Sequence, residues 1–166
     1  MNIQQIVMTT EYQTPQNACV FTGHRELPKD FSIERLKQAI ITLLDNGVRV
    51  FYNGMAIGFD LLAAETLLQV RKNYEGVKLI ACIPCYNQEK SFPAADKKRY
   101  AEILKRADEQ VLLAEHYFQG CMQIRDKYMV DKADVMIAYC HKEKGGAAFT
   151  VKYFQKTKPL NQVIFI

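Results

Sequence analysis

Continuous apolar runs alternate along this chain with segments of helical periodicity. The apolar runs cover residues 18–22, 48–52, 77–83, 109–114, 133–139 and 163–166. Strands that are apolar throughout, rather than alternately apolar and polar, are typical of a parallel sheet buried on both faces. Runs of this kind separated by helices predict an α/β fold.

Helical patterns occupy the segments between these runs. In the first, apolar residues recur at helical spacing from Ile33 to Leu44, Ser32 stands at the N-cap position, and Asn46-Gly47 ends the helix. Further helices are predicted at about 61–73, 94–106, 121–132 and 147–156. The elements together predict one doubly wound α/β domain over residues 18–166, with a mostly parallel sheet and helices on both faces. Residues 1–17 are polar and weakly patterned, and we interpret them as an N-terminal extension.

Composition narrows the class of protein without changing the expected fold. Of the 166 residues, 49% are hydrophobic and 24% are charged, and the net charge of +4 is spread along the chain. This mild charge is compatible with a small anionic ligand and argues against nucleic acid as a partner. No apolar run reaches membrane-spanning length, and residues 1–17 lack the basic start and apolar core of a signal peptide. We therefore expect a cytoplasmic protein with no membrane partner.

The five cysteines cannot all pair within one chain. Cys82 and Cys85 form a single CxxC at the end of an apolar run, and no second pair or suitably spaced histidine accompanies them. A structural zinc site needs four such ligands. We therefore expect no metal site and interpret these cysteines as buried or strand-end thiols.

Two glycine turns are the main candidate ligand contacts. GMAIGFD at residues 54–60 joins an apolar run to a helix, and Gly145-Gly146 opens another helix. Glycines let the backbone approach a ligand closely, and the free N–H groups of a helix N-terminus favour an anion. Because ligands of doubly wound folds bind beyond the carboxyl ends of the strands, we expect the two turns to meet at one edge. The alternative is that such a turn only packs a helix against a strand.

Polar side chains follow the same strand ends. Arg25 and Arg125 suit a phosphate, because a guanidinium binds phosphate through paired hydrogen bonds. Two roles stay open for Asp60, which are hydrogen bonds to ribose hydroxyls and a contribution to the cap of the following helix. His24 remains open between a ligand contact and an ordinary loop residue, and Arg125 between phosphate binding and a surface ion pair.

Four motifs in this order resemble one protein family. They are FTGHR at 21–25, GMAIGFD at 54–60 with AAE at 63–65, GCMQIRDKYMVD at 120–131 and GGAAFTV at 145–151. Together they resemble the YpsA-like branch of the SLOG superfamily, which joins DprA-type and LOG-type Rossmann-like proteins, from about Ala18 to Ile166. The resemblance implies a Rossmann-like fold that binds a nucleotide or a nucleotide-derived ligand, of the NAD or ADP-ribose type among others. The implied ligand-binding residues are Thr22, Gly23, His24, Arg25, Gly54, Met55, Gly58, Asp60, Arg125, Gly145, Gly146 and Thr150.

The resemblance to the LOG enzymes is incomplete. These enzymes cleave the N-glycosidic bond of nucleoside 5′-monophosphates and carry a methionine–x–x–arginine segment, which Met122 and Arg125 match, and a Gly-Gly-x-Gly-Thr-x-x-Glu turn. The chain follows that turn only loosely, and Tyr153 stands where the catalytic glutamate belongs. Glycosidic cleavage needs a carboxylate near the sugar, so this departure favours ligand binding over catalysis.

Three functions follow as hypotheses. The first is binding of a nucleotide-like small molecule, and the second is a nucleoside 5′-monophosphate N-glycosidase with candidate catalytic residues Asp60, Glu65 and Arg125. The third is a DprA-like module that binds nucleic acid or another protein. The chain has no stripe of basic and aromatic residues, which argues against nucleic acid. Related folds pair through helices beside the site, so a homodimer is compatible with this reading.

Overall fold

The computed structural model describes residues 17–166. Residues 1–16, which hold most of the expected N-terminal extension, lie outside the described residues. The elements in chain order are β1 (Ala18–Gly23), α1 (Ile33–Asp45), β2 (Val50–Asn53), α2 (Phe59–Val70), the 3-10 helix η1 (Arg71–Asn73), β3 (Lys78–Ile83), the 3-10 helix η2 (Gln88–Ser91), α3 (Ala94–Arg106), β4 (Glu109–Leu112), α4 (Cys121–Lys132), β5 (Val135–Tyr139), α5 (Gly146–Thr157) and β6 (Val163–Phe165).

The strands form a six-stranded sheet in the order β4-β3-β2-β1-β5-β6, and all five neighbouring pairs are parallel. The chain builds outward from β1 to β4, then returns across the sheet to place β5 on the other side of β1. The strand order therefore reverses between β1 and β5, and doubly wound folds bind ligands at the carboxyl ends of the strands beside such a reversal.

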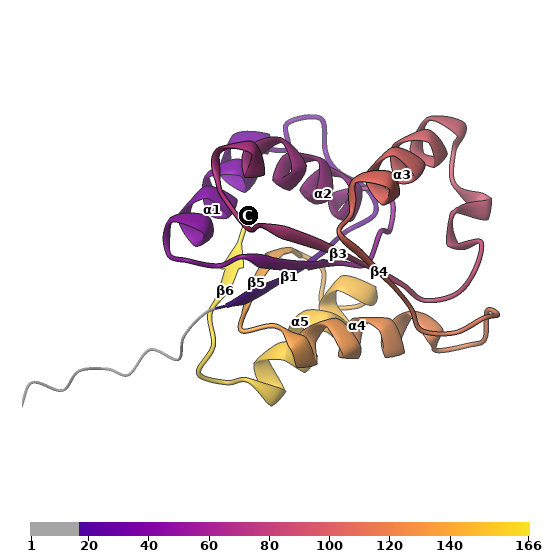
Figure 1. Cartoon of the computed structure of the whole chain (residues 1–166). Coiled ribbons are helices and arrows are strands. Elements are labelled where there is room, and N and C mark those ends of the chain that lie inside the picture. The colour runs from indigo at the N-terminus through magenta and orange to yellow at the C-terminus, as the bar shows by residue number, and fades with distance from the viewer. Residues whose placement is uncertain (1–16) are drawn as a thin grey trace, which may run out of the picture.

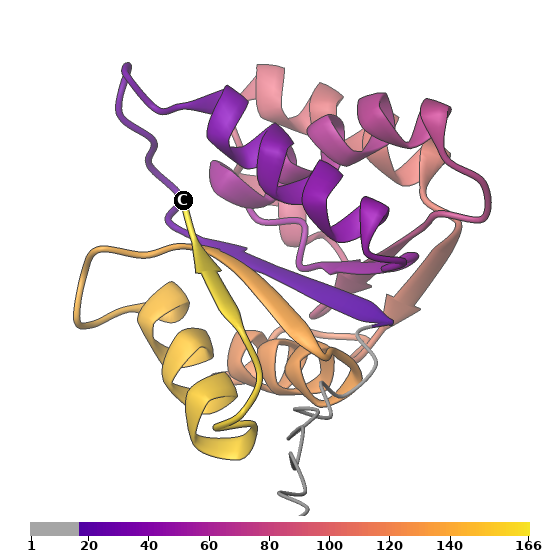
Figure 2. The same ribbon diagram turned by 90° about the vertical axis from the view of Figure 1, so that its left-hand side faces the viewer.

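Helices cover both faces of this sheet. Figure 1 shows α1, α2 and α3 on one face and α4 and α5 on the other, and the turned view in Figure 2 shows the same two layers. The predicted doubly wound α/β domain is thus confirmed. Among residues 17–166, no helix has the length and apolar character needed to cross a membrane.

The core consists of two apolar clusters, one on each face of the sheet. On the face of α1 and α2, Phe21 and Phe51 are fully buried, and their rings stack with centroids 5.7 Å apart. On the other face, Val20 and Met136 pack with Phe154 of α5. Successive residues of a strand point to opposite faces, so Val20 and Phe21 of β1 each serve a different cluster.

Most element bounds agree with the predictions, and the differences have local causes. Helices α3 and α4 have the predicted bounds, and Ser32 caps α1 by accepting a hydrogen bond from the Arg35 N–H at 3.2 Å. Strand β2 begins two residues later than predicted, because the N–H of Val48 is still bound to the Leu43 carbonyl of α1. The predicted helix at 61–73 starts earlier, at Phe59, and its last three residues form the separate 3-10 helix η1.

Candidate functional site

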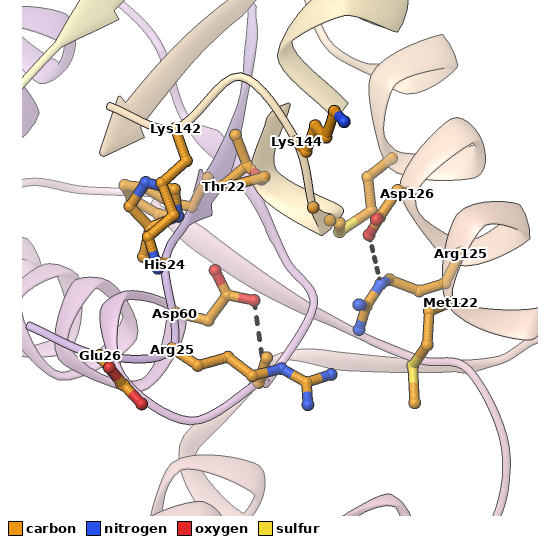
Figure 3. Close-up of a pocket in the computed structure, with 17 residues that line it drawn as sticks. Thr22, His24, Arg25, Glu26, Asp60, Met122, Arg125, Asp126, Lys142 and Lys144 are labelled. Carbon is orange, nitrogen blue, oxygen red and sulfur yellow. Dashed lines mark hydrogen bonds and ion pairs between the residues drawn. The ribbon is translucent and has the colours of Figure 1, made fainter. Parts of the chain in front are cut away.

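A cavity of about 360 Å³ lies at the strand reversal, where the two glycine turns face each other (Figure 3). Four segments line it: residues 21–26 at the end of β1, the β2–α2 turn through Ala56 and Asp60, helix α4 between Met122 and Met129, and the β5–α5 loop between Lys142 and Ala147. The two turns predicted to meet at one edge of the sheet therefore do so.

Asn53, at the end of β2, fixes the shape of the first glycine turn. Its side-chain oxygen accepts a hydrogen bond from the Met55 N–H at 2.8 Å, and its Nδ2 donates to the Asp60 carbonyl at 2.8 Å. The turn also needs Gly58, whose φ is 81° and where a Cβ would lie 2.2 Å from the Arg25 carbonyl oxygen. Asn53 is fully buried and shapes the turn without lining the cavity.

Arg125 joins helix α4 to the first turn. Its Nη1 donates to the Gly54 carbonyl, and its Nε donates to Oδ1 of Asp126 at 2.6 Å. Arg125 thus forms an ion pair with Asp126, one of the two partners that the sequence left open, but the residues are only 5% and 7% exposed, so the pair is buried and not on the surface. A Cβ at Gly54 would lie 2.7 Å from Nη1, which explains the glycine at that position.

Thr150 completes a connection between the two turns. Its hydroxyl lies 3.0 Å from Oδ2 of Asp126 and 2.9 Å from the Gly146 carbonyl, and its side chain is fully buried. We call Gly54, Arg125, Asp126, Thr150 and Gly146 the turn-linking network. Because buried hydrogen bonds to charged groups are strong, this network holds the two turns at a fixed separation.

Asp60 presents an unusual carboxylate to the cavity. It is 6% exposed, its Oδ2 accepts from the Ala56 N–H at 3.3 Å, and its Oδ1 is buried with no hydrogen-bond partner among the described residues. Figure 3 shows this carboxylate between His24 and Arg25, with one oxygen directed away from the dashed bond. Burial raises the pKa of Asp60 to about 7, with Asp126 adding to the effect and Arg125 opposing it. The carboxyl group can therefore accept or donate a hydrogen bond near neutral pH.

The β5–α5 loop supplies an electropositive wall. Gly145, with a φ of 104°, is the N-cap of α5 and offers no side-chain cap, so the first N–H groups of the helix need another partner. Lys142 and Lys144 precede this helix start, and Arg25, which follows β1, lines the same cavity. A cavity lined by a helix N-terminus and by three cationic side chains favours an anion.

His24 lines the cavity and also connects three parts of the fold. Its backbone N–H donates to the Tyr139 carbonyl at 3.1 Å, and its own carbonyl accepts from the Phe59 N–H at 3.1 Å. Its ring Nε2 accepts from the His141 N–H at 3.0 Å, which leaves the proton of the neutral ring on Nδ1. Burial, followed by the nearby His141 and Lys142, lowers the pKa of His24.

The predicted site residues divide into two groups by position. Eight line the cavity: Thr22, Gly23, His24, Arg25, Asp60, Arg125, Gly145 and Gly146. Four lie behind it and shape the turns: Gly54, Met55, Gly58 and Thr150. The charged lining residues outside this set of twelve are Glu26, Asp126, Lys142 and Lys144, of which Asp126 belongs to the GCMQIRDKYMVD motif. The position of the two lysines just before Gly145-Gly146 was the signal that could have identified them.

Glu65 is the clearest correction among the candidate catalytic residues. It does not line the cavity and instead forms a two-pronged ion pair with Arg99 of α3, with both hydrogen bonds at 2.8 Å. Tyr153 also lies outside the lining, and its hydroxyl donates to Asp131 at 2.9 Å. Asp60 is therefore the candidate catalytic carboxylate that faces the cavity.

The cysteines and histidines form no metal centre in the described part of the chain, residues 17–166, where no group of three or more His, Cys, Asp or Glu side chains is placed to hold an ion. All five cysteines are free thiols. Cys82 lies within β3 and Cys85 follows it, both buried, which confirms their interpretation as buried or strand-end thiols.

Comparison with known proteins gives a family. Residues 8–164 match the family model YpsA, described as the YspA SLOG family, so the match begins within the segment 1–17. The relatives include the UPF0398 protein BH1768 of Halalkalibacterium halodurans, 24% identical over 145 residues that cover 86% of this chain and 76% of the relative. The UPF0398 protein YpsA of Bacillus subtilis strain 168 is 27% identical over 114 residues, which cover 68% of this chain and 63% of that protein.

Two solved structures share the fold. DNA processing protein A from Helicobacter pylori, in a structure concerned with its single-stranded DNA binding mode, superposes with a TM-score of 0.63 at 22% identity, covering 91% of this chain and 65% of that one. DprA from Streptococcus pneumoniae superposes with a TM-score of 0.65 at 20% identity, covering 90% of this chain and 50% of that one. The chain thus spans half to two thirds of these proteins, and the likeness shows a shared Rossmann-like fold.

Proposed function

The chain belongs to the YspA SLOG family, and we propose that it binds a nucleotide or nucleotide-derived ligand in the cavity between its two glycine turns. One observation carries this proposal. The unpaired, buried Oδ1 of Asp60 and the uncapped N-terminus of α5 belong to the walls of the same cavity. A ligand with hydroxyl groups at one end and phosphate at the other satisfies both.

The phosphate is expected over the start of α5. The N–H groups after Gly145 donate to it, and Lys142, Lys144 and Arg25 neutralise its charge. The guanidinium of Arg125 adds positive charge from α4, although two of its nitrogens already bind Gly54 and Asp126. The turn-linking network supports the proposal because it fixes the turns before a ligand arrives, which lowers the entropy cost of binding.

The sugar is expected beside Asp60. A buried carboxylate oxygen without a partner is costly, and a ribose hydroxyl that donates to Oδ1 removes that cost. The raised pKa of Asp60 also lets the group bind in its protonated form, in which it donates to a ligand oxygen. Asp60 thereby discriminates in favour of ligands with a polar group at this position.

Titration calorimetry at pH 7 with AMP, other mononucleotides, NAD, ADP-ribose and unphosphorylated adenosine tests this proposal. At least one phosphorylated compound should bind with a Kd below 1 mM, about −4 kcal/mol, and adenosine should bind at least about tenfold more weakly. Lys144→Ala should weaken binding of the phosphorylated compound, whereas Lys97→Ala on the exposed surface of α3 should not. The proposal is contradicted if no phosphorylated compound binds with a Kd below 1 mM. It is also contradicted if Lys144→Ala and Lys97→Ala change the affinity equally.

Asp60 also favours a second candidate function, hydrolysis of a nucleotide N-glycosidic bond. The reaction needs a carboxyl group that stabilises positive charge at the anomeric carbon or transfers a proton, and Asp60 lines the cavity with a raised pKa. The test is release of free base from nucleoside 5′-monophosphates. Asp60→Asn should abolish release and Glu65→Gln should retain it, because Glu65 pairs with Arg99 outside the cavity. Binding without release leaves the first proposal as the function.

Nucleic acid remains a third candidate to be tested in solution. The Helicobacter pylori neighbour is described by its single-stranded DNA binding mode, whereas the mild net charge of +4 argues against such a partner for this chain. A gel shift with single-stranded DNA at increasing salt tests whether this chain binds nucleic acid. Our expectation is no shift at physiological salt, and a salt-sensitive complex would contradict it.

A further inference from the structure

Two buried thiols from distant parts of the sequence meet beside the start of α4. Cys85 follows the end of β3, Cys121 is the first residue of α4, and the two residues are only 3% and 1% exposed. The side chains of Cys85 and Cys121 are hydrogen-bonded to each other. Cys82, the other cysteine of the CxxC motif, instead packs in the core cluster of Val20 and Met136. We call Cys85 and Cys121 the thiol pair.

Backbone hydrogen bonds hold the two segments that carry the thiol pair. The N–H of Tyr86 donates to the Glu115 carbonyl at 3.3 Å, which joins the residue after Cys85 to the β4–α4 loop. The N–H of Cys121 donates to the Phe118 carbonyl at 3.1 Å, which closes the same loop at the helix start. Two thiols form a disulfide only where the backbone brings them close together, and these bonds meet that condition.

The surroundings of the thiol pair suit thiol–disulfide exchange. Gly120, the N-cap of α4, provides no side-chain cap, and the free N–H groups of a helix start stabilise a thiolate. Burial raises the pKa of the Cys85 thiol, with Cys121 adding to the effect and Arg125 opposing it. The β4–α4 loop carries the exposed Tyr117, so it lies at the surface, and local opening there admits a small reagent.

We propose that Cys85 and Cys121 are a modification site, at which a reversible disulfide fixes the start of α4. The Cys121 thiolate attacks a small disulfide such as oxidised glutathione, which releases one glutathione thiol and leaves a mixed disulfide on Cys121. The Cys85 thiolate then attacks the Cys121 sulfur and releases the second glutathione thiol. One S–S bond in the protein thus replaces two S–H bonds, and both protons and two electrons pass to glutathione.

The disulfide would act on the wall of the cavity that α4 supplies. Met122 and Arg125 of this helix line the cavity (Figure 3), and Arg125 also binds the Gly54 carbonyl. Arg125 lies about one helical turn after Cys121, on the same side of α4. Oxidation therefore ties this wall to the end of β3. Because a disulfide also restricts the unfolded chain, the oxidised protein should be more stable than the reduced protein, whichever ligand the cavity binds.

Peptide mapping of the full chain after incubation with oxidised glutathione tests the proposal. We expect a pair of peptides joined through Cys85 and Cys121, lighter by two hydrogen atoms, which dithiothreitol separates again. The thermal midpoint of the oxidised protein should lie several degrees above that of the reduced protein. Cys121→Ser should remove both the crosslink and this rise. Cys140→Ser, at the least buried of the five cysteines, is the matched control and should keep both.

Several results would overturn the proposal. A crosslink between Cys82 and Cys85, or reaction of Cys140 alone, would show that exchange does not occur at the thiol pair. Absence of any disulfide in the folded chain would show that the pair serves packing only, and an unchanged midpoint after crosslinking would overturn its stabilising effect. Mapping uses the unaltered chain and does not depend on a variant, and Cys121→Ala replaces Cys121→Ser if the serine variant unfolds.

Discussion

The hydroxyl of Thr150 lies 3.0 Å from the carboxylate of Asp126, and both side chains are buried. Thr150 belongs to α5, the helix that follows the Gly145-Gly146 turn. Asp126 belongs to α4 and pairs with Arg125, which binds the carbonyl of Gly54 in the other glycine turn, so the contact connects the two turns. Thr150 therefore influences the cavity without lining it.

Thr150→Val removes this contact while keeping the shape of the side chain. A carboxylate oxygen of Asp126 then loses a buried partner, and we expect the free energy of unfolding to fall by about 1–3 kcal/mol. Urea unfolding measures the change. Thr157→Val is the control, because the Thr157 hydroxyl binds a backbone carbonyl of its own helix at an exposed position, and we expect a change within about 0.5 kcal/mol. Equal losses in the two variants would show that the network contributes nothing.

Gly54→Ala tests the position of Arg125. The new Cβ would lie 2.7 Å from Nη1, so the guanidinium must move and its bond to the Gly54 carbonyl is lost. We expect a loss of about 1–3 kcal/mol in stability, measured by urea unfolding. Gly146→Ala meets no atom within 4 Å and should change stability by less than about 1 kcal/mol. A Gly54→Ala protein as stable as the Gly146→Ala protein would contradict this position of Arg125.

Asp60→Asn should stabilise the protein at alkaline pH. The pKa of Asp60 is raised from 3.8 to about 7, so the stability linked to this group is present below pH 3.8 and is lost as the pH rises through about 7. The ionised, unpaired carboxylate is thus a cost of a few kcal/mol at pH 8, which the asparagine avoids. Urea unfolding at pH 8 and pH 5 should show a larger gain at pH 8, at the same time as nucleotide affinity falls. Asp30→Asn, an exposed loop residue, is the control, and a pH-independent difference for Asp60→Asn would refute the assignment.

His24 should have the opposite pH dependence. Burial of the ring, followed by the nearby His141 and Lys142, lowers its pKa from 6.5. The ring also accepts a hydrogen bond from the His141 N–H, which only the neutral form can do. The stability from this bond is present above pH 6.5 and is lost as the pH falls through the lowered pKa. Proton NMR titration of the ring should give a value below 6.5, with His24→Ala used to assign the resonance. A value at or above 6.5 would show that the ring is free of this bond.

The arrangement of the site was predictable where it follows from local sequence and the topology of parallel sheets. Apolar runs and helical periodicity located every strand and α-helix, and glycines after two of the runs indicated turns at the same edge. Helix α4 has the predicted bounds because Gly120, with a φ of 96°, and the apolar run of β5 limit it on both sides.

The long-range contacts were not predictable in this way. Arg125 and Gly54 are 71 residues apart, and nothing local to either residue indicates that one binds the other. The direction of Glu65, in contrast, follows from helix geometry. Five residues turn an α-helix by about 140° from Asp60, so the two candidate carboxylates point to different sides of α2, and Glu65 pairs with Arg99 of α3.

The most direct test of the account is an amide NMR titration of this 19.1 kDa protein with AMP and NAD. If the phosphate lies over the start of α5, the largest shifts should fall on the amides of Gly145, Gly146 and Ala147, with a second set at Ala56 beside Asp60. Shifts confined to α3 and β4, or no shifts at millimolar nucleotide, would contradict a nucleotide site between the two glycine turns.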